Sequence, residues 1–427
     1  MKKCRLAVDT SYLTMKFSYW KKGASTALLL LFFINSYAQN LDPNAILTHV
    51  RVLASDSLEG RGTATVGEIK AANYIASWFL QAGLEPKGGN GSFFQPFGTV
   101  IHYEGIPHQV TARNVVGFLD NGAEQTIVIG AHYDHLGKGF QSGSLTANSE
   151  ELIHNGADDN ASGTAGLIEL ARYFAGNKVI EKYNFLFIAF SGEELGLLGS
   201  KFYTSHPTIP MESVNFMINM DMIGRLDESK GLTIGGWGTS PTWGLLMPAL
   251  ALKNTLKYAV DSSGIGPSDH TSFYLKEKPV LFFFTGVHTD YHKVTDDADK
   301  INSTGEQKIL RLIADLVTEL DKVPTALTFT EAGNPHTQET QTTFKVTLGI
   351  IPDYSFNGQG LRIDAVTKNR PAARAGLETG DIIVRMGEYP IKDIQDYMKS
   401  LGQFESGQSI DVAVRRKAEN KVLRVTF

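Results

Sequence analysis

Cysteine is almost absent from the chain, with a single residue, Cys4, among 427. Cys4 lies in an N-terminal segment that we expect to be removed, so the mature protein would contain no thiol. This absence excludes disulfide bonds, thiolate catalysis and thiolate zinc ligands. A bound metal would have to be held by histidine, aspartate and glutamate side chains.

The chain also lacks an excess of positive charge. Its formal net charge is −5, and residues 1–38 carry six basic residues against one acidic residue, so the remainder is near −10. Nucleic acids bind to basic surfaces, and a chain this acidic is a poor partner for them. We therefore expect no nucleic acid among its ligands.

A long apolar run near the N-terminus is missing as well. The run "ALLLLFFI", residues 27–34, is too short for a typical membrane span. It follows a basic stretch and precedes the small-x-small site Ser36-Tyr37-Ala38, which together predict a signal peptide over residues 1–38. The mature protein would then be secreted or periplasmic, with no stable membrane span. An uncleaved anchor is the alternative, and Met15 is an alternative start because the basic stretch is unusually long.

The chain contains enough apolar material for two domains, since 42% of its residues are hydrophobic. Near-continuous apolar runs, which predict buried strands, alternate with amphipathic helical patterns. This alternation predicts an α/β domain with a mostly parallel central sheet flanked by helices, over residues 39–323. The predicted strands are residues 126–130, 184–190, 214–220 and 279–286.

Helical patterns cover residues 41–84 and 303–321, and Ser303 and Glu306 have the spacing of a capping box. The composition then changes. Residues 324–343 are polar, rich in threonine and without periodicity, which indicates a linker. Residues 344–427 combine short strand patterns, glycine-rich turns and one helical pattern, so we expect a small strand-rich domain there.

Acidic residues and histidines follow the apolar strand runs. In open α/β sheets, binding sites form beyond the carboxyl ends of the strands. One polar strand end is unremarkable because strand ends are exposed, but chance would supply lysine, serine and asparagine as often. The residues concerned are His132, Asp134, His135, Asp158, Asp159, Glu193, Glu194, Asp221, His288, Tyr291 and His292.

Imidazole and carboxylate groups without thiolates suit Zn²⁺ or a similar ion in a catalytic site. The set exceeds the three protein ligands of one catalytic zinc and matches two metal ions about 3.5–4 Å apart that share a carboxylate. We therefore expect two zinc ions per chain, although cobalt or manganese also fits. For the pair Asp158–Asp159, a solvated turn is the alternative interpretation.

Five motifs, in order, resemble those of the M28 family of di-zinc metallopeptidases, which includes secreted bacterial aminopeptidases. The resemblance covers residues 45–322 and implies a zinc-exopeptidase fold in which a metal-activated water hydrolyses peptide bonds. The motifs are "AHYDH", "NGADDNASG", "FSGEELGLLGS", "NMDMIG" and "DYHKVTDDADK".

The resemblance also implies the ligands of the two metals. His132 and Asp221 would bind one zinc ion, and Glu194 and His292 the other. Asp158 would bridge both ions, with a cis peptide bond between it and the next residue.

Other site residues have roles implied in the same way. Glu193 would be the general base, and Asp134 would orient the imidazole of a ligand from the second shell. Tyr291 resembles the tyrosine that stabilises the oxyanion in some members. We expect His135 and His288 to be ordinary loop histidines, whereas Asp269 and His270 lie either near the substrate pocket or in a turn.

The C-terminal region resembles a PDZ domain of the bacterial protease-associated kind. The stretch "PAARAGLETGDIIV", residues 371–384, carries most of the resemblance. Leu348, Gly349 and Ile350 match the loop whose N–H groups hold the C-terminal carboxylate of a peptide bound by strand addition. The alternative is a PDZ domain that only packs against the catalytic domain.

The resemblance predicts a metallo-exopeptidase acting on peptides or proteins, most directly an aminopeptidase. One alternative is a single-zinc glutaminyl cyclase of related fold, and another is an inactive scaffold that binds partners through the PDZ domain. The presence of five expected ligands and the base favours the peptidase. No motif encodes the side-chain preference.

Overall fold

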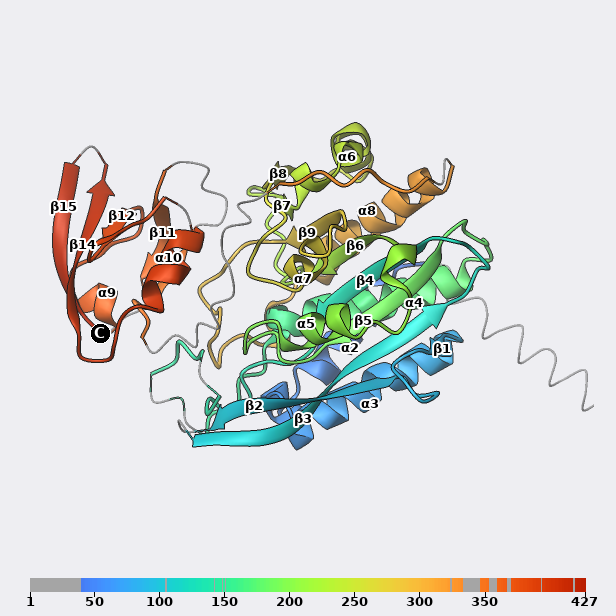
Figure 1. Cartoon of the computed structure of the whole chain (residues 1–427), viewed down its shortest axis with the longest axis horizontal. Helices are drawn as coiled ribbons and strands as arrows, with labels where there is room; N and C mark the ends of the chain where they lie inside the picture. Colours follow the sequence, from blue (N-terminus) through green and yellow to red (C-terminus); the bar gives the residue numbers. More distant parts are fainter. Residues whose placement is uncertain are drawn as a thin grey trace, which may run out of the picture.

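The computed structural model describes residues 40–103, 106–141, 143–147, 149, 151–322, 325–332, 346–352, 359–366, 370–392, 394–417 and 419–427. The expected signal peptide lies outside these residues. Within them, none of the helices combines the length and the hydropathy that a membrane crossing requires. Figure 1 shows a large α/β domain and a smaller strand-rich domain that contains the C-terminus.

The large domain is built on a sheet with the strand order β1-β3-β5-β4-β6-β9-β7-β8, and β2 pairs with β3. The strands are β1 (Glu85–Pro86), β2 (Phe94–Tyr103), β3 (Ile106–Leu119), β4 (Thr126–His132), β5 (Asn184–Phe190), β6 (Val214–Met220), β7 (Leu232–Gly235), β8 (Tyr258–Val260) and β9 (Val280–Phe284).

The predicted α/β class is confirmed, and the parallel pairing is concentrated in the centre of the sheet. Strands β5, β4, β6 and β9 are parallel neighbours. Towards one edge, β3 pairs antiparallel with β5, and β2 pairs antiparallel with β3 because the two are joined by a short hairpin connection. The four central strands are the ones that the apolar runs predicted, since burial on both faces leaves no polar alternation.

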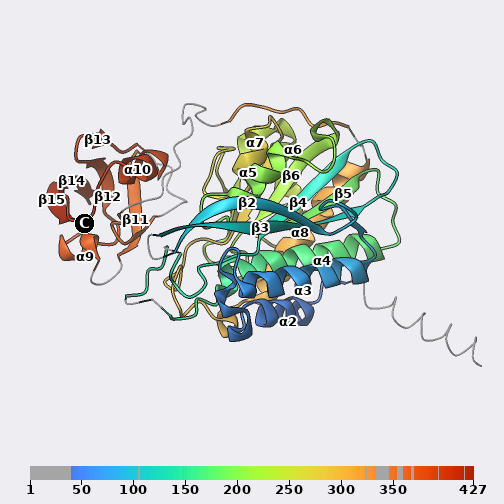
Figure 2. The same cartoon turned by 60° about the horizontal axis from the view of Figure 1, so that its bottom comes forward.

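Helices cover both faces of this sheet, as Figure 2 shows. Helices α2, α3, α4, α6 and α8 share one core with one face, while α5 and α7 pack on the other. The helices are α2 (Pro43–Leu53), α3 (Val66–Ala82), α4 (Gly163–Gly176), α5 (Leu198–Ser205), α6 (Pro241–Lys253), α7 (His270–Tyr274) and α8 (Ser303–Lys322).

The helical pattern over residues 41–84 is divided into α2 and α3 by a turn at "LEGRG". Helix α2 ends at Leu53, and within the 3-10 segment that follows, Asp56–Arg61, Glu59 and Gly60 have φ values of 48° and 68°. A side chain at Gly60 would place its Cβ 2.5 Å from the carbonyl oxygens of Gly137 and His154. The break is therefore required by the close approach of three segments, and it leads the chain into Arg61.

The small domain has its own apolar core and an antiparallel sheet in the order β10-β11-β12-β14-β15, with β13 paired to β12. Gly349, at φ 72°, immediately precedes β10. The elements are β10 (Ile350–Pro352), β11 (Leu361–Val366), α9 (Pro371–Arg374), β12 (Ile382–Met386), β13 (Tyr389–Pro390), α10 (Ile394–Leu401), β14 (Ser409–Arg416) and β15 (Glu419–Thr426).

Two features connect the domains. Residues 325–332 of the expected linker run along the large domain, where Thr330 N–H donates to Thr239 O at 2.8 Å and Leu327 N–H donates to Asn215 Oδ1 at 2.8 Å. In addition, Arg370 Nη2 of the small domain donates to Ser144 O of the large domain at 2.9 Å. The exact domain boundaries remain predictions.

Candidate metal centre

The central parallel strands all end at one edge of the sheet, and the expected site residues follow there. His132 is the last residue of β4, and Glu193 and Glu194 come shortly after β5. Asp221 directly follows β6, and His292 lies in the loop after β9. Strand topology therefore brings together residues that are up to 160 positions apart in the chain.

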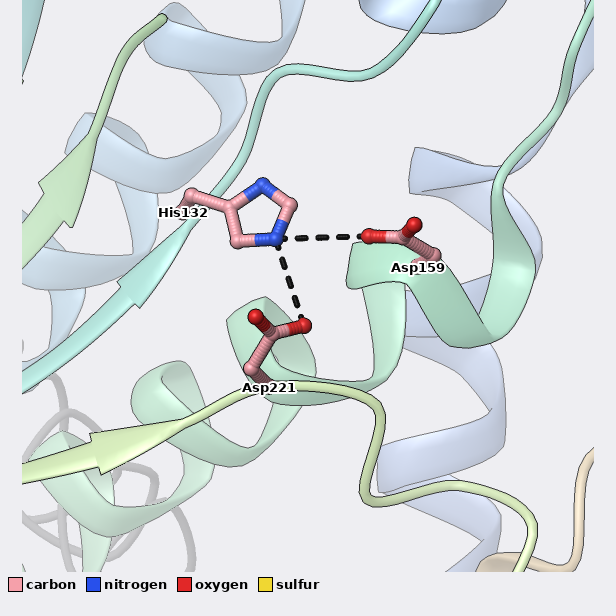
Figure 3. A group of neighbouring side chains, drawn as sticks. All are labelled: His132, Asp159 and Asp221. Carbon is pink, nitrogen blue, oxygen red and sulfur yellow. Dashed lines mark hydrogen bonds and ion pairs between the residues drawn. The ribbon is translucent and has the colours of Figure 1, made fainter. Parts of the chain in front are cut away.

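His132, Asp159 and Asp221 form the first of two groups that could hold a metal ion. His132 Nε2 lies 3.3 Å from Asp159 Oδ1 and 3.3 Å from Asp221 Oδ1. In Figure 3 the two carboxylates converge on this nitrogen, Asp159 from a helical turn and Asp221 from the end of a strand. One imidazole nitrogen and two carboxylate oxygens are a suitable donor set for Zn²⁺.

The second group uses the other oxygen of Asp159. Its Oδ2 lies 3.2 Å from His292 Nε2, which is itself 3.1 Å from Glu194 Oε2. His135, Asp159 and Glu194 also gather closely enough to hold an ion. The carboxylate of Asp159 therefore faces the imidazole of His132 with one oxygen and that of His292 with the other.

The structure contradicts the expectation that Asp158 lies among the candidate ligands, because the neighbouring Asp159 faces them instead. Asp158 is fully buried and points away from the centre, where Oδ1 accepts from Gly224 N–H at 2.7 Å and Oδ2 lies 3.1 Å from His288 Nε2. Neighbouring residues in a turn point in different directions, so only one of the pair can reach the ligands. The cis peptide bond is likewise displaced and joins Asp159 to Asn160.

The expectation for His135 and His288 as ordinary loop histidines is also wrong. His135 Nδ1 is 2.7 Å from Glu194 Oε1, and its Nε2 is buried without a hydrogen-bond partner. The same Nδ1 lies 3.9 Å from Asp159 Oδ2, so this nitrogen and the two carboxylates could hold an ion together. No feature of the residue types distinguished these histidines from surface ones.

Backbone carbonyls fix the ring orientation of the two expected histidine ligands. His132 Nδ1 is 3.2 Å from Asp134 O, and His292 Nδ1 is 2.9 Å from Gly143 O. A carbonyl can only accept, so each Nδ1 carries a proton, and Nε2 is the ring nitrogen that faces the centre. Both imidazoles are therefore oriented so that Nε2 could bind a metal after losing its proton.

Asp134 acts on the site in two ways. Its backbone oxygen orients His132, whereas its carboxylate lies 3.7 Å from the same ring and instead accepts from Glu193 N–H at 3.1 Å and Thr63 Oγ1 at 3.0 Å. The carboxylate thus holds the loop that carries Glu193. The side chain of Glu193 reaches to 4.0 Å from His132 Nε2.

Tyr291 stacks on the imidazole of His292 with ring centroids 3.9 Å apart. Its proposed action on an oxyanion remains a prediction. Asp269 is buried, and among the described residues neither of its carboxylate oxygens has a hydrogen-bond partner; burial raises its pKa to about 7. His270 is buried beside it, and burial lowers its pKa to about 3.

The charge balance of the cluster fits bound cations. Burial by itself would lower the pKa of His132, yet Asp221 and Glu193 hold that pKa well above its ordinary value. Burial opposes ionisation of Asp159, yet the imidazoles of His132 and His292 hold the pKa of Asp159 well below its usual range. Protons on the imidazoles thus supply the positive charge that metal ions would otherwise bring.

Comparison with known proteins agrees with this centre. Residues 114–317 match peptidase family M28, and residues 327–427 match the PDZ domain. The chain is 30% identical over 186 residues to the alkaline phosphatase isozyme conversion protein of Escherichia coli, covering 42% of this chain and 51% of that protein. It is 26% identical over 227 residues to a probable leucine aminopeptidase of Arthroderma otae, covering 51% and 60%. The chain thus spans only about half to three-fifths of these relatives.

Solved structures share the fold. A leucine aminopeptidase precursor from Bacteroides thetaiotaomicron aligns with a TM-score of 0.54 at 17% identity, covering 66% of this chain and 98% of that one. A glutaminyl cyclase from the same organism aligns with a TM-score of 0.53 at 18% identity, covering 65% and 98%. The likeness extends to a peptidase and a cyclase alike, so the fold alone does not distinguish them.

Just under half of the chain, residues 114–317, is thus similar to peptidase family M28, and the C-terminal region is similar to the PDZ domain. The expected fold class is confirmed, and the match to peptidase family M28 agrees with the expected peptidase class. The PDZ match begins at residue 327, within the expected linker.

Proposed function

We propose that the protein is a di-zinc aminopeptidase that removes N-terminal residues from peptides or proteins. The observation that carries the proposal is Asp159, whose two carboxylate oxygens each face a different histidine, at 3.3 Å and 3.2 Å. A carboxylate shared in this way is the arrangement that two neighbouring metal ions need. His132 and Asp221 would hold one ion, and Glu194 and His292 the other, with His135 as a further donor beside Glu194.

Bound zinc would supply a nucleophilic water at neutral pH and polarise the scissile carbonyl. The protein's own groups would then position the substrate and move protons. Glu193 accepts a proton from the attacking water and delivers it to the leaving amine. Burial, together with the negative charges of Asp221 and Glu194, raises the pKa of Glu193, which suits a group that must both accept and release a proton.

The PDZ domain would take the C-terminus of an extended peptide at Leu348, Gly349 and Ile350. The left-handed conformation of Gly349 supports this assignment because it turns successive N–H groups to one side. Thr347 Oγ1 accepts from Gly349 N–H at 3.1 Å, so an incoming carboxylate would replace that bond. The signal peptide is the basis for proposing a secreted or periplasmic enzyme.

The variant Glu193→Gln tests the role of the general base without removing a metal ligand. We expect this variant to retain about two zinc ions per chain and to lose at least about 100-fold in kcat, because general acid–base catalysis contributes about 10²–10⁴-fold. Zinc would be counted by elemental analysis, and activity followed with aminoacyl fluorogenic substrates with free and blocked N-termini, with and without chelator. Near wild-type turnover of this variant would remove Glu193 from the mechanism.

Asp159→Ala provides the complementary test. It should fail to reach two zinc ions per chain even at saturating zinc, since both positions lose an oxygen. In the wild-type protein, one zinc ion per chain would favour the cyclase, and none would favour a scaffold. Hydrolysis of blocked substrates as fast as free ones would contradict an aminopeptidase.

A further inference from the structure

Asp158, the neighbour of the proposed bridging residue, contacts two of the loops that supply the centre, the one after β6 and the one after β9. Its Oδ1 accepts from Gly224 N–H at 2.7 Å, three residues beyond Asp221. Its Oδ2 lies 3.1 Å from Nε2 of His288, which is four residues before His292. One buried carboxylate therefore links the Asp221 loop and the His292 loop to the turn that carries Asp159.

The tautomer of His288 makes this contact directional. Asp290 N–H donates to His288 Nδ1 at 3.2 Å, so the neutral ring carries its proton on Nε2. That N–H donates to Asp158. Ser162 Oγ donates to the other oxygen of Asp158 at 3.0 Å, and the carboxylate thus has a donor on each side.

Asp296 holds the same turn from behind. Its Oδ2 accepts from the N–H groups of Asp158 and Asp159 at 2.8 Å and 3.0 Å, and its backbone oxygen accepts from Ala157 N–H at 2.9 Å. Three successive N–H groups are thus fixed by one fully buried residue. Arg225 Nη2 lies 3.5 Å from Asp296 Oδ1 and partly balances its charge.

We infer that Asp158, His288 and Asp296 are positioning residues that fix the distance between the two metal positions. The inference rests on the proposed di-zinc function. Asp159 would be shared by both metal ions. The two metal positions therefore keep their spacing only while the Asp221 loop and the His292 loop keep fixed positions relative to the turn that carries Asp159. The contacts of Asp158 and Asp296 set that relation, although neither residue would touch a metal.

Asp158→Ala removes the link without removing a ligand. Partners of this kind typically contribute 10–100-fold to metal affinity, so we expect both zinc affinities to fall by that factor while the stoichiometry at saturating zinc stays at two. Affinity would be measured by competition with a chelator. In the Co²⁺-substituted protein, the visible absorption band should change shape because the ligand geometry changes.

The histidine provides a second route if Asp158→Ala does not fold. His288→Ala should weaken zinc binding, and His288→Gln should restore much of the affinity because its amide can donate to Asp158 in place of Nε2–H. Asp299→Ala is the control for the loss of a negative charge in Asp158→Ala, because Asp299 is exposed and lies in the segment after β9 that also carries His288.

Wild-type zinc affinity in Asp158→Ala, or equal affinity in His288→Ala and the wild type, would overturn the inference. A wild-type stoichiometry other than two would instead refute the proposed function, and that count is made on the unmodified protein. A loss of stoichiometry in Asp158→Ala would make Asp158 a ligand, which also contradicts a positioning role.

Discussion

Arg61 is a permanent cation of the large domain, and its side chain is buried next to the loops of the candidate metal centre. Its guanidinium donates to four carbonyl oxygens from three segments. Among them are Tyr133 O at 2.8 Å, next to His132, and Gly156 O at 2.9 Å, three residues before Asp159. Burial lowers the pKa of Arg61 to about 10, so the group remains charged at neutral pH. It therefore offsets part of the negative charge of the carboxylates when no metal is bound.

Arg61→Met should destabilise the metal-free protein more than the zinc-bound protein. We expect a loss of at least about 3 kcal/mol in the metal-free form, since four buried carbonyls lose their donor and the carboxylates lose a counter-charge. Zinc supplies positive charge and should recover part of that loss. Denaturant unfolding with and without zinc would measure the difference, with Arg61→Lys as the partial replacement. Equal destabilisation of both forms would contradict the electrostatic role.

At the scale of single residues, the sequence predicted which strand ends supply the gathered side chains, but not which of two adjacent aspartates faces them. Four of the expected side chains gather: His132, Glu194, Asp221 and His292. Each lies at or beyond the end of a strand, and the burial of these strands gives them apolar runs that can be recognised in the sequence. The pair Asp158–Asp159 is different, since both residues have the same side chain and only the turn geometry decides which one faces the centre. For that reason the bridging position was assigned one residue too early.

Glu68 connects the N-terminus of helix α3 to the loop that carries Glu193. Glu68 N–H donates to Thr65 Oγ1 at 3.3 Å, and Ala64 N–H donates to Glu68 Oε2 at 2.7 Å. The other carboxylate oxygen of Glu68 accepts from Ser191 Oγ, two residues before Glu193. Burial raises the pKa of Glu68 to about 8.

Glu68→Gln should flatten the pH dependence of stability between about pH 5 and pH 8. In the unfolded chain Glu68 ionises near its ordinary pKa of about 4.3, whereas in the folded protein it keeps its proton up to a pKa of about 8. Unfolding therefore releases a proton in this window, and the stability of the wild type falls as the pH rises. As the pH rises through this window, the unfolding free energy of the variant should increase relative to that of the wild type by up to about 1.4 kcal/mol per pH unit. Parallel pH profiles of the unfolding free energy would contradict the shifted ionisation.

At the scale of elements, the buried strands and the long helix α8 were predictable because burial and amphipathic spacing are strong signals. The capping box expected at Ser303 and Glu306 does not form: Asn302 Oδ1 accepts from Gly305 N–H at 2.9 Å, and both carboxylate oxygens of Glu306 are buried without a partner. The separation of α2 from α3 was also missed, because the close packing that requires Gly60 comes from residues far away in the chain.

For the whole molecule, the contact between the domains leads directly to the metal centre. Arg370 of the PDZ domain donates a hydrogen bond to Ser144 O. The residues on either side of Ser144 both contact His292. Gly143 O lies 2.9 Å from His292 Nδ1, and Leu145 N–H donates to His292 O at 2.8 Å. The side chain of Arg370 also packs over Gly349, where an added Cβ would meet its Cβ at 2.2 Å. One residue thus touches both the expected peptide-binding loop and the loop that orients a metal ligand.

Arg370→Ala should weaken zinc binding without altering the stoichiometry. A hydrogen bond from a charged donor contributes about 1.5–3 kcal/mol when buried and less when partly exposed, so we expect a loss of at most about tenfold. Chelator competition on the full-length protein would measure it. Arg374→Ala is the matched control, since Arg374 bonds Thr426 O within its own domain. Equal zinc affinities in the two variants would show that the contact does not reach the metal centre.

The segment 325–332, which is bonded to the catalytic domain, limits how far the PDZ domain can be from the active site. Only 13 residues, 333–345, separate it from the PDZ core residue Val346. Even a fully extended chain of that length spans no more than about 50 Å. A peptide held at the PDZ domain would therefore meet the catalytic domain at an effective concentration in the millimolar range. Weak capture is then sufficient to favour substrates long enough to reach both domains, whereas a dipeptide gains no such advantage.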